Sequence, residues 1–358
     1  MRGRCAHLKL EPRMATSSSD LHHGRISRRV FALAAACSAS AVMAPALQAQ
    51  PRPEKTRVGI AVTGKGELQY LPLTIADQLG YFKAEGLEVE LIEGANASAD
   101  IVSGRFDQVI SLQARGQAMQ SFVLQGRAPA IALGVSTRTL PQYRSVSDLR
   151  GRRIGVSATG SASHLMANRI LTQAGVRPAE VTFISVGGST LAQSALRAGQ
   201  IDALCNNDPA MTLLEQRAEV RIVSDARTLK GTEQIYGGLM PAACLMASQD
   251  FVQKHPLTCQ ALAHATVHAL KWLQTAGPRD IIKNVPEPYL LGDRALYLAS
   301  FDKLRESISP DGILSPEAAQ TALRALSAFD ASVAASRIDL PRTYTNGFVR
   351  RAKDRFRV

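Results

Sequence analysis

The chain has 358 residues, a formal charge of +12, 46% hydrophobic residues and 20% charged residues. That composition is enough for a sizeable core and for about two domains, and it excludes a disordered, collagen-like or disulfide-scaffold protein. Residues 1–49 carry seven basic and two acidic side chains, and without them the charge falls to +7. No basic stripe runs through the rest of the chain, so no nucleic-acid partner is expected.

Residues 1–49 have the organisation of an export signal. The pair Arg28-Arg29 is followed by the uncharged, Ala-rich and Ser-rich stretch 30–51, which ends in small residues around Ala49. This order is typical of a secretory signal, and the paired arginines resemble a twin-arginine signal. We therefore expect a periplasmic location. Cys37 is not expected to carry a lipid anchor, because the preceding tripeptide lacks the usual leucine.

The rest of the chain contains one internal repeat. Residues 57–64 (RVGIAVTG) match residues 153–160 (RIGVSATG), and residues 104–111 match residues 199–206. The order of the predicted elements is also the same in both copies. One strand-helix-strand-helix-strand unit is therefore used twice, which is too few copies for a solenoid.

Each copy predicts a small parallel sheet with helices on its faces. In the first copy, we expect strands at 58–62, 89–92 and 108–112, and helices at 71–82 and 97–104, with Gly80 or Gly86 ending the first helix. In the second copy, we expect strands at 154–156, 181–186 and 202–205, and helices at 161–174 and 190–198. The predicted fold class is α/β, with two such lobes.

The segments outside the copies predict how the lobes connect. Segments near 134–149 and 232–245 lead into and out of the second copy, so the chain crosses twice, with hinge residues near 136–139 and 236–239. Four further helices, expected to pack on the first lobe, are predicted at 249–254, 256–275, 293–307 and 316–331. The resulting division is an export signal at 1–49, lobe I at 50–135 plus 240–340, lobe II at 140–235, and a basic C-terminal tail at 341–358.

Catalytic and metal-binding motifs are missing or incomplete. There is no Gly-x-Ser-x-Gly elbow, and Gly64-Lys65-Gly66 lacks the second half of a phosphate-binding loop. His264 and His268 lie one helical turn apart without a third ligand, which favours a packing role over zinc. We expect no enzyme activity, no metal and no cofactor.

Three cysteines follow the signal: Cys205, Cys244 and Cys259. The odd number leaves at least one free thiol, and the spacing does not fit a metal site. Burial as small apolar side chains is expected, although a Cys244–Cys259 bridge is possible in an oxidising compartment.

Several motifs together resemble the periplasmic solute-binding proteins of ABC importers. They are LPL at 71–73, LGYF at 79–82, DLRGRRIGV at 148–156 and AGQIDA at 198–203, followed by Asp208-Pro209. The resemblance covers about residues 55–275, and the most similar group is the sulfonate, nitrate, taurine and thiamine-precursor type, the NMT1/THI5-like family. It implies a type II two-lobed periplasmic binding fold with a double-crossing hinge. It also implies a monomer that binds a small molecule and works with an inner-membrane permease. The related pyrimidine synthases use a cysteine-rich motif, where this chain has Cys205-Asn206-Asn207.

The ligand is predicted to bind between the lobes. In open parallel sheets, ligands bind beyond the carboxyl ends of the strands. The candidate ligand-binding residues at those ends are Thr63, Gly64, Tyr70, Asn96, Ser111 and Gln113 in the first copy, and Thr159, Gly160, Ser161, Ser163, His164, Gly188, Ser189, Asn206, Asn207 and Asp208 in the second.

The residues favour an anionic ligand without deciding it. The stretch 157–163 offers backbone N–H groups and small hydroxyls at a helix start, and His164 adds a charge if it is protonated. Ser161 or Ser163 could instead only cap the helix. Asp208 would repel an anion or pair with an amine. A small sulfonate or carboxylate is the first expectation, a zwitterion fits both features, and a neutral pyrimidine stacked on Tyr70 is the alternative, as is a sensor role.

Overall fold

The computed structural model describes residues 52–94, 99–290 and 292–358. The predicted export signal and Asn96 therefore lie outside the described residues. Within the described residues, no helix combines the length and the apolar character that a membrane crossing requires.

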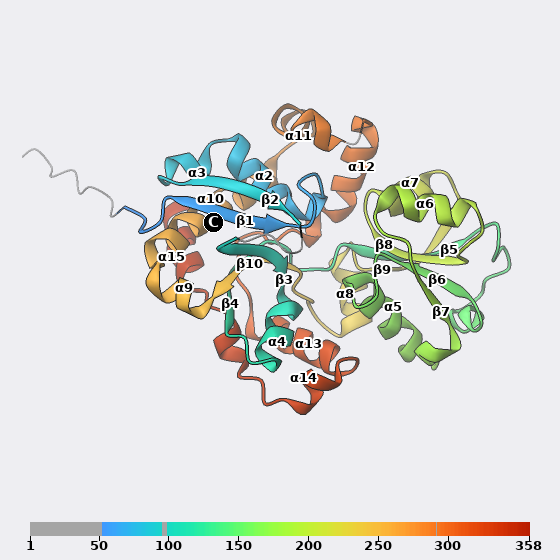
Figure 1. Ribbon diagram of the computed structural model, residues 1–358. Helices are drawn as coiled ribbons and strands as arrows, with labels where there is room; N and C mark the ends of the chain where they lie inside the picture. Colours follow the sequence, from blue (N-terminus) through green and yellow to red (C-terminus); the bar gives the residue numbers. More distant parts are fainter. Residues whose placement is uncertain (1–51, 95–98, 291) are drawn as a thin grey trace, which may run out of the picture. The chain divides into compact units, whose positions relative to one another are not determined.

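Two five-stranded mixed sheets form the framework (Figure 1). The first sheet has the order β2 (Glu88–Glu93), β1 (Arg57–Val62), β3 (Ile101–Arg105), β10 (Ala243–Ser248) and β4 (Met119–Leu124). The second has the order β7 (Thr182–Ser185), β6 (Arg153–Val156), β8 (Ala203–Asn207), β5 (Ile131–Ser136) and β9 (Val220–Asp225). The predicted α/β fold with two lobes is confirmed, and we call each sheet with its helices the first or the second lobe.

The two sheets have equivalent topologies. In each, three parallel strands come from one copy of the repeat, and the fourth strand runs antiparallel to its neighbours. That fourth strand, β10 or β5, is reached after the chain has crossed from the other sheet. Each crossing therefore leads into a strand that is hydrogen-bonded to a neighbouring strand on each of its two edges.

The helices connect the strands and complete both lobes. They are α2 (Leu71–Gln78), α3 (Tyr81–Ala84), α4 (Phe106–Ala114), α5 (Ala162–Gln173), α6 (Ser189–Arg197), α7 (Ala210–Gln216), α8 (Leu229–Tyr236), α9 (Gln249–Lys254), α10 (Pro256–Thr275), α11 (Pro278–Asn284), α12 (Arg294–Leu304), α13 (Pro316–Ser327), α14 (Ala331–Ala335) and α15 (Gly347–Phe356). Gly80, with a φ of 70°, separates α2 from α3, so the predicted end of the first helix at Gly80 is confirmed.

The second copy was predicted well, whereas the end of the first copy was not. The helix predicted at 97–104 is wrong, because Ile101–Arg105 form strand β3. The strand predicted at 108–112 is also wrong, because it lies inside helix α4. Phe106, Val109 and Ile110 are buried at helical spacing along α4, and this packing decides the helix.

The first crossing lies earlier than predicted. Residues 131–136 form β5 of the second sheet, so the chain crosses over residues 125–130, not near 136–139, and the predicted lobe I boundary at residue 135 is too late. The second crossing follows α8 and precedes β10, over residues 237–242, which overlaps the predicted 236–239. Strands β4, β5, β9 and β10 were not predicted from the sequence.

The predicted C-terminal tail is a packed helix. Helix α15 contacts α10 and β4 and buries Phe348, Val349 and Ala352. Its Arg355 donates to Glu85 at the end of α3. The segment is basic, as expected, but its apolar face is part of the core of the first lobe.

Candidate ligand-binding site

One cavity of ≈ 760 Å³ lies at the carboxyl ends of strands from both sheets. Its size falls in the range of small-molecule sites. The first sheet and its connections contribute a surface that includes Thr63, Gly64, Glu67, Tyr70, Gly94, Arg105 and Asp107, which we call the first wall. The second sheet and its connections contribute Ser157, Ser161, Ser163, Arg169, Gly188, Ser189, Asn206, Asn207 and Asp208, which we call the second wall.

In the first wall, the polar groups near β1 bond to one another. The Tyr70 hydroxyl accepts from the Thr63 backbone N–H at 3.2 Å and lies 2.9 Å from the Thr63 hydroxyl. The Thr63 hydroxyl also donates to Glu67 at 2.9 Å. Burial raises the pKa of Glu67, although hydrogen bonds from Thr63 and Gln69 oppose the change. Tyr70 lines the cavity but is only 2% exposed, and its hydroxyl is already bonded.

The charged pair of the first wall is also internally satisfied. Arg105, the last residue of β3, donates to both oxygens of Asp107, at 2.9 and 3.1 Å. Burial disfavours the charge on Arg105, but the attraction of Asp107 outweighs it and raises the pKa. The pair is therefore close to neutral towards a ligand.

The start of α5 brings three hydroxyls of the second wall together. The Ser163 hydroxyl accepts from the Ser157 backbone N–H at 3.0 Å and lies 2.9 Å from the hydroxyls of both Ser157 and Ser161. Ser161 is the N-cap, and its hydroxyl accepts from the His164 N–H at 3.3 Å. The capping role that the sequence left open for Ser161 is therefore present.

The surroundings of His164 disfavour a positive charge on its ring. Its Nδ1 accepts from the Gly160 backbone N–H at 3.0 Å, and its ring packs edge-on against Phe183. Burial lowers its pKa, which favours the neutral imidazole. The expectation that His164 adds charge to an anion site is not supported.

The start of α6 lies at the cavity and has no capping side chain. Its N-cap is Gly188, which makes no side-chain capping bond, and the first intrahelical bond is donated by Ala192. The N–H groups of the first turn therefore have no capping side chain. Asn206, at the end of β8, is held in place by a bond to the Gly187 carbonyl and by the Asn207 N–H.

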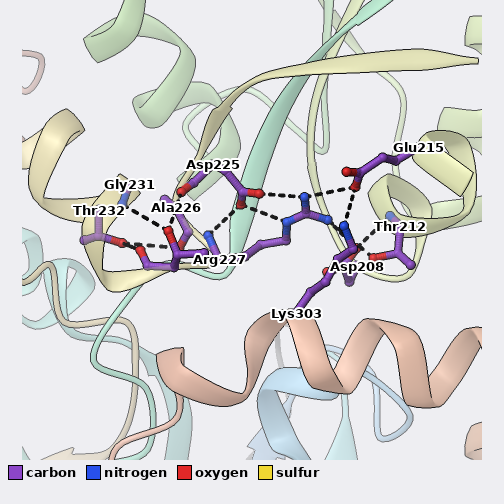
Figure 2. Close-up of polar contacts among 10 residues, drawn as sticks. Asp208, Thr212, Glu215, Asp225, Ala226, Arg227, Gly231, Thr232 and Lys303 are labelled. Carbon is purple, nitrogen blue, oxygen red and sulfur yellow. Dashed lines mark hydrogen bonds and ion pairs between the residues drawn. The ribbon is translucent and has the colours of Figure 1, made fainter. Parts of the chain in front are cut away.

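Asp208 is buried in the second wall beside a buried arginine (Figure 2). Its Oδ1 accepts from the Thr212 N–H at 2.8 Å and lies 3.5 Å from Nη1 of Arg227. Its Oδ2 is buried and has no hydrogen-bond partner. Burial raises the pKa of Asp208, while Arg227 and Thr212 act against that change.

One cation of the cavity has no carboxylate partner in the described part of the chain. The Nε of Arg169, on α5, donates to the Ile235 carbonyl at 3.1 Å, and no ion pair with an acidic side chain neutralises it. Apolar side chains also line the cavity: Leu165, Met240, Leu326 and Phe329. The cavity can therefore hold a ligand with both a charged group and an apolar part.

The structure brings ten of the sixteen predicted residues to the cavity: Thr63, Gly64, Tyr70, Ser161, Ser163, Gly188, Ser189, Asn206, Asn207 and Asp208. Thr159, Gly160 and His164 lie beside it but do not line it, and Asn96 lies outside the described residues. Ser111 and Gln113 are on α4 and do not line it, because the strand predicted there is a helix. Gln113 instead donates to the Asp339 carbonyl.

Sequence reasoning missed Glu67, Arg105, Asp107 and Arg169. A signal existed for Arg169, which lies seven residues after Ala162 and four after Leu165, so all three share one face of α5. Arg105 and Asp107 were missed because the third strand of the first copy was predicted at 108–112, whereas β3 ends at Arg105.

The other candidate groups have structural roles. His264 bonds to Glu85, and His268 is stacked between Tyr81 and Phe356, away from the cavity. All three cysteines are buried and unbridged, so the possible Cys244–Cys259 bridge is not formed. Among the described residues, no cluster of three His, Cys, Asp or Glu side chains suits a metal ion.

Comparison with known proteins agrees with this architecture. The family model described as NMT1/THI5 like matches residues 67–278. A solved protein of Bordetella bronchiseptica RB50 is 46% identical with a TM-score of 0.79, covering 86% of this chain and all of that chain. The alkanesulfonate-binding protein of Xanthomonas axonopodis pv. citri, solved bound to MOPS, shares the fold at 18% identity and a TM-score of 0.61, covering 83% of this chain and 100% of that chain.

An enzyme is also among the relatives. The 4-amino-5-hydroxymethyl-2-methylpyrimidine phosphate synthase of Schizosaccharomyces pombe is 25% identical over 211 residues, which are 55% of this chain. The match spans only 59% of that protein's length.

Proposed function

The chain belongs to the NMT1/THI5 like family, and on that premise we propose that it is the periplasmic substrate-binding component of an ABC-type importer. It captures a small organic anion of the sulfonate or carboxylate type in the cavity between its two lobes and delivers it to a permease in the inner membrane. The export signal proposed for residues 1–49 accounts for the location.

The position of Arg169 is the observation that supports an anionic ligand. It is a cavity-lining cation without a carboxylate partner among the described residues, whereas Arg105 is already paired with Asp107. The first turn of α6 adds backbone N–H donors and the positive end of a helix dipole. A carboxylate or sulfonate oxygen would accept from both.

We propose that the ligand contacts the cavity-lining candidates from both walls. The ring of Tyr70 covers the ligand, Asn206 and Ser189 bond its polar atoms, and the two lobes close on it about the crossings at 125–130 and 237–242. Closure should reduce the radius of gyration in small-angle scattering. An unchanged scattering curve at a saturating ligand concentration would contradict it.

A neutral pyrimidine is the second candidate ligand. The similarity to a pyrimidine synthase favours it, and Tyr70 is among the residues that line the cavity. An enzymatic role is the weaker alternative, because the three cysteines of the described residues are buried and none lines the cavity. A role as a ligand sensor would use the same cavity and would differ only in the membrane partner.

Calorimetry tests the proposal with four ligand classes: alkanesulfonates, aromatic carboxylates, nitrate and pyrimidines. Binding of an acid without turnover supports the proposal. Binding of pyrimidines alone supports the second candidate, and turnover of any compound supports an enzyme. Loss of uptake of the bound compound on deletion of the gene would distinguish an importer from a sensor.

A further inference from the structure

The second sheet has two ends, and the cavity lies at only one of them. Strands β6, β7, β8 and β9 run in the same direction, towards the end where Asn206 lines the cavity, and β5 runs the opposite way. The other end is built by residues 137–153, 177–182, 197–203 and 217–221, which we call the distal end of the second lobe. None of these residues lines the cavity, so this end is separate from the proposed ligand site.

Arginine is the dominant charged residue of the distal end. Its four segments contain no lysine and nine arginines: Arg138, Arg144, Arg150, Arg152, Arg153, Arg177, Arg197, Arg217 and Arg221. They contain four carboxylates: Asp148, Glu180, Asp202 and Glu219. Nine cations against four anions leave an excess of five positive charges. Because the arginines come from four separate segments, no continuous basic stretch marks this surface in the sequence.

The four segments form one continuous surface. Hydrogen bonds connect residues 137–153 to each of the other three segments: Thr137 to Ala218 at 2.8 Å, Gly151 to Glu180 at 2.7 Å, and Asp202 to Arg153 at 2.8 Å. Arg221 donates to the Tyr143 carbonyl, and its guanidinium carbon lies 5.2 Å from the centre of the Tyr143 ring. The arginines of the four segments therefore act together on any partner that approaches this end.

Only part of this positive charge is compensated locally. Four of the nine arginines pair with carboxylates of the same surface, at N–O distances of 2.8 to 3.7 Å: Arg150 and Arg177 with Glu180, Arg153 with Asp202, and Arg197 with Glu219. Within the described part of the chain, the other five make no ion pair, and all are exposed: Arg138, Arg144, Arg152, Arg217 and Arg221. We call these the five distal arginines.

The distal end is charged and has no exposed apolar centre. Among the described residues, the large hydrophobic side chains that are exposed are Leu191 and Leu239, and neither lies at this end. Stable protein–protein interfaces have a hydrophobic centre and a polar rim. Arginines spread over a surface without such a centre suit many small anionic groups instead, and a guanidinium matches a phosphate with two parallel hydrogen bonds. A bilayer of anionic phospholipids presents such phosphates.

We propose that the distal end of the second lobe is an electrostatic docking surface for an anionic phospholipid bilayer, with lipid phosphates bonded by the five distal arginines. Each basic residue close to an anionic bilayer strengthens the attraction by about fivefold, and salt screens it. The cavity lies at the other end of the sheet, so docking leaves it accessible. This role goes beyond substrate capture, because it holds an exported binding protein at the membrane that contains its permease.

Vesicle sedimentation tests the proposal. The protein recovered after export is used, so that the proposed export signal does not contribute. One set of vesicles contains equal parts of phosphatidylglycerol and phosphatidylcholine, and the other contains phosphatidylcholine alone. The distal variant combines three substitutions at exposed arginines without an ion-pair partner in the described part of the chain: Arg138→Gln, Arg144→Gln and Arg217→Gln.

A matched control variant separates the surface from the net charge. It removes the same number of positive charges from exposed positions outside the second lobe: Arg57→Gln, Lys254→Gln and Arg294→Gln. Thermal melting verifies that both variants are folded. Poly-glutamate and a DNA duplex are titrated in parallel as soluble polyanions, which represent an acidic protein and a nucleic acid.

The wild-type protein should bind the anionic vesicles and not phosphatidylcholine alone. Salt at about 1 M, where the screening length is about 3 Å, should release it. The distal variant should bind on the order of 100-fold more weakly, and the control variant should stay within about fivefold of the wild type. Equal losses in the two variants, equal binding to both kinds of vesicle, or no binding to either would overturn the proposal. Tighter binding of poly-glutamate or DNA than of the anionic vesicles would assign the surface to that partner and also overturn it.

Discussion

The two walls of the cavity come from two copies of one unit, yet they use their polar groups differently. In the first wall, Thr63, Glu67 and Tyr70 bond one another, and Arg105 is paired with Asp107. The second wall keeps an unpartnered carboxylate oxygen, and the first turn of α6 has no capping side chain. A ligand contributes most where polar groups of the protein have no hydrogen-bond partner of their own. A repeated unit can therefore become a binding surface when the polar groups of one copy are left without partners.

The largest expected effect is on stability, and it follows the removal of Arg227, the buried arginine beside Asp208 in the second wall. Arg227→Met leaves Asp208 and Asp225 without their buried partner, so the free energy of unfolding should fall by about 3–5 kcal/mol. Urea unfolding measures the loss. The control is Arg197→Met, whose half-exposed pair with Glu219 should cost at most about 1 kcal/mol. Similar losses in both variants would contradict the assigned importance of Arg227.

The second prediction concerns ligand affinity at the same wall. Arg169→Met should weaken the binding of the tightest acid by on the order of tenfold or more, because a charge-assisted hydrogen bond contributes about 1.5–3 kcal/mol. Arg150→Met is the control, since Arg150 is half-exposed in the same lobe and does not line the cavity. Calorimetry on both variants decides whether Arg169 holds the acid, and equal affinities would show that it does not.

A substitution in the first wall should have a smaller effect. Thr63→Val removes a hydroxyl that already bonds Glu67 and Tyr70, so affinity should change by no more than about fivefold, equivalent to about 1 kcal/mol. The same titration series measures it. A loss larger than that of Arg169→Met would reverse the order of the two walls.

The smallest expected effect is at Gln113. The sequence placed Gln113 among the candidate ligand-binding residues, but α4 places this residue outside the cavity, so Gln113→Ala should leave the affinity unchanged. Asn206→Ala should weaken binding, because Asn206 lies at the end of β8 and lines the cavity. Parallel titrations of the two variants test the pair, and a loss in Gln113→Ala would mean that α4 participates in binding.

The same contrast explains how much of the fold the sequence could predict. Strands β6, β7 and β8 and helices α5 and α6 follow their apolar patterns, and their predicted ranges agree with the structure. In the first copy, the likeness of residues 104–107 to 199–202 misplaced two elements. Strand β3 contains Ser103 and Gly104, which do not resemble a buried strand, and Ser103 is stabilised by a bond to Gln125 that only the fold creates.

The site shows the same limit. Position at a strand end was enough to predict Asn206, Asn207 and Asp208 as cavity residues. The partner of Asp208 could not be predicted, because Arg227 is nineteen residues away and follows β9, a strand that the pattern did not indicate. An unused oxygen depends on how every neighbouring donor is shared, and sequence spacing does not determine that sharing.

A crystal structure with the tightest-binding acid at saturating concentration tests the central claim most directly. We expect ligand density in the cavity, with acidic oxygens within hydrogen-bond distance of Arg169 or the first turn of α6. Density on another surface, or a ligand in the cavity whose charged groups contact only the first wall, would contradict the account.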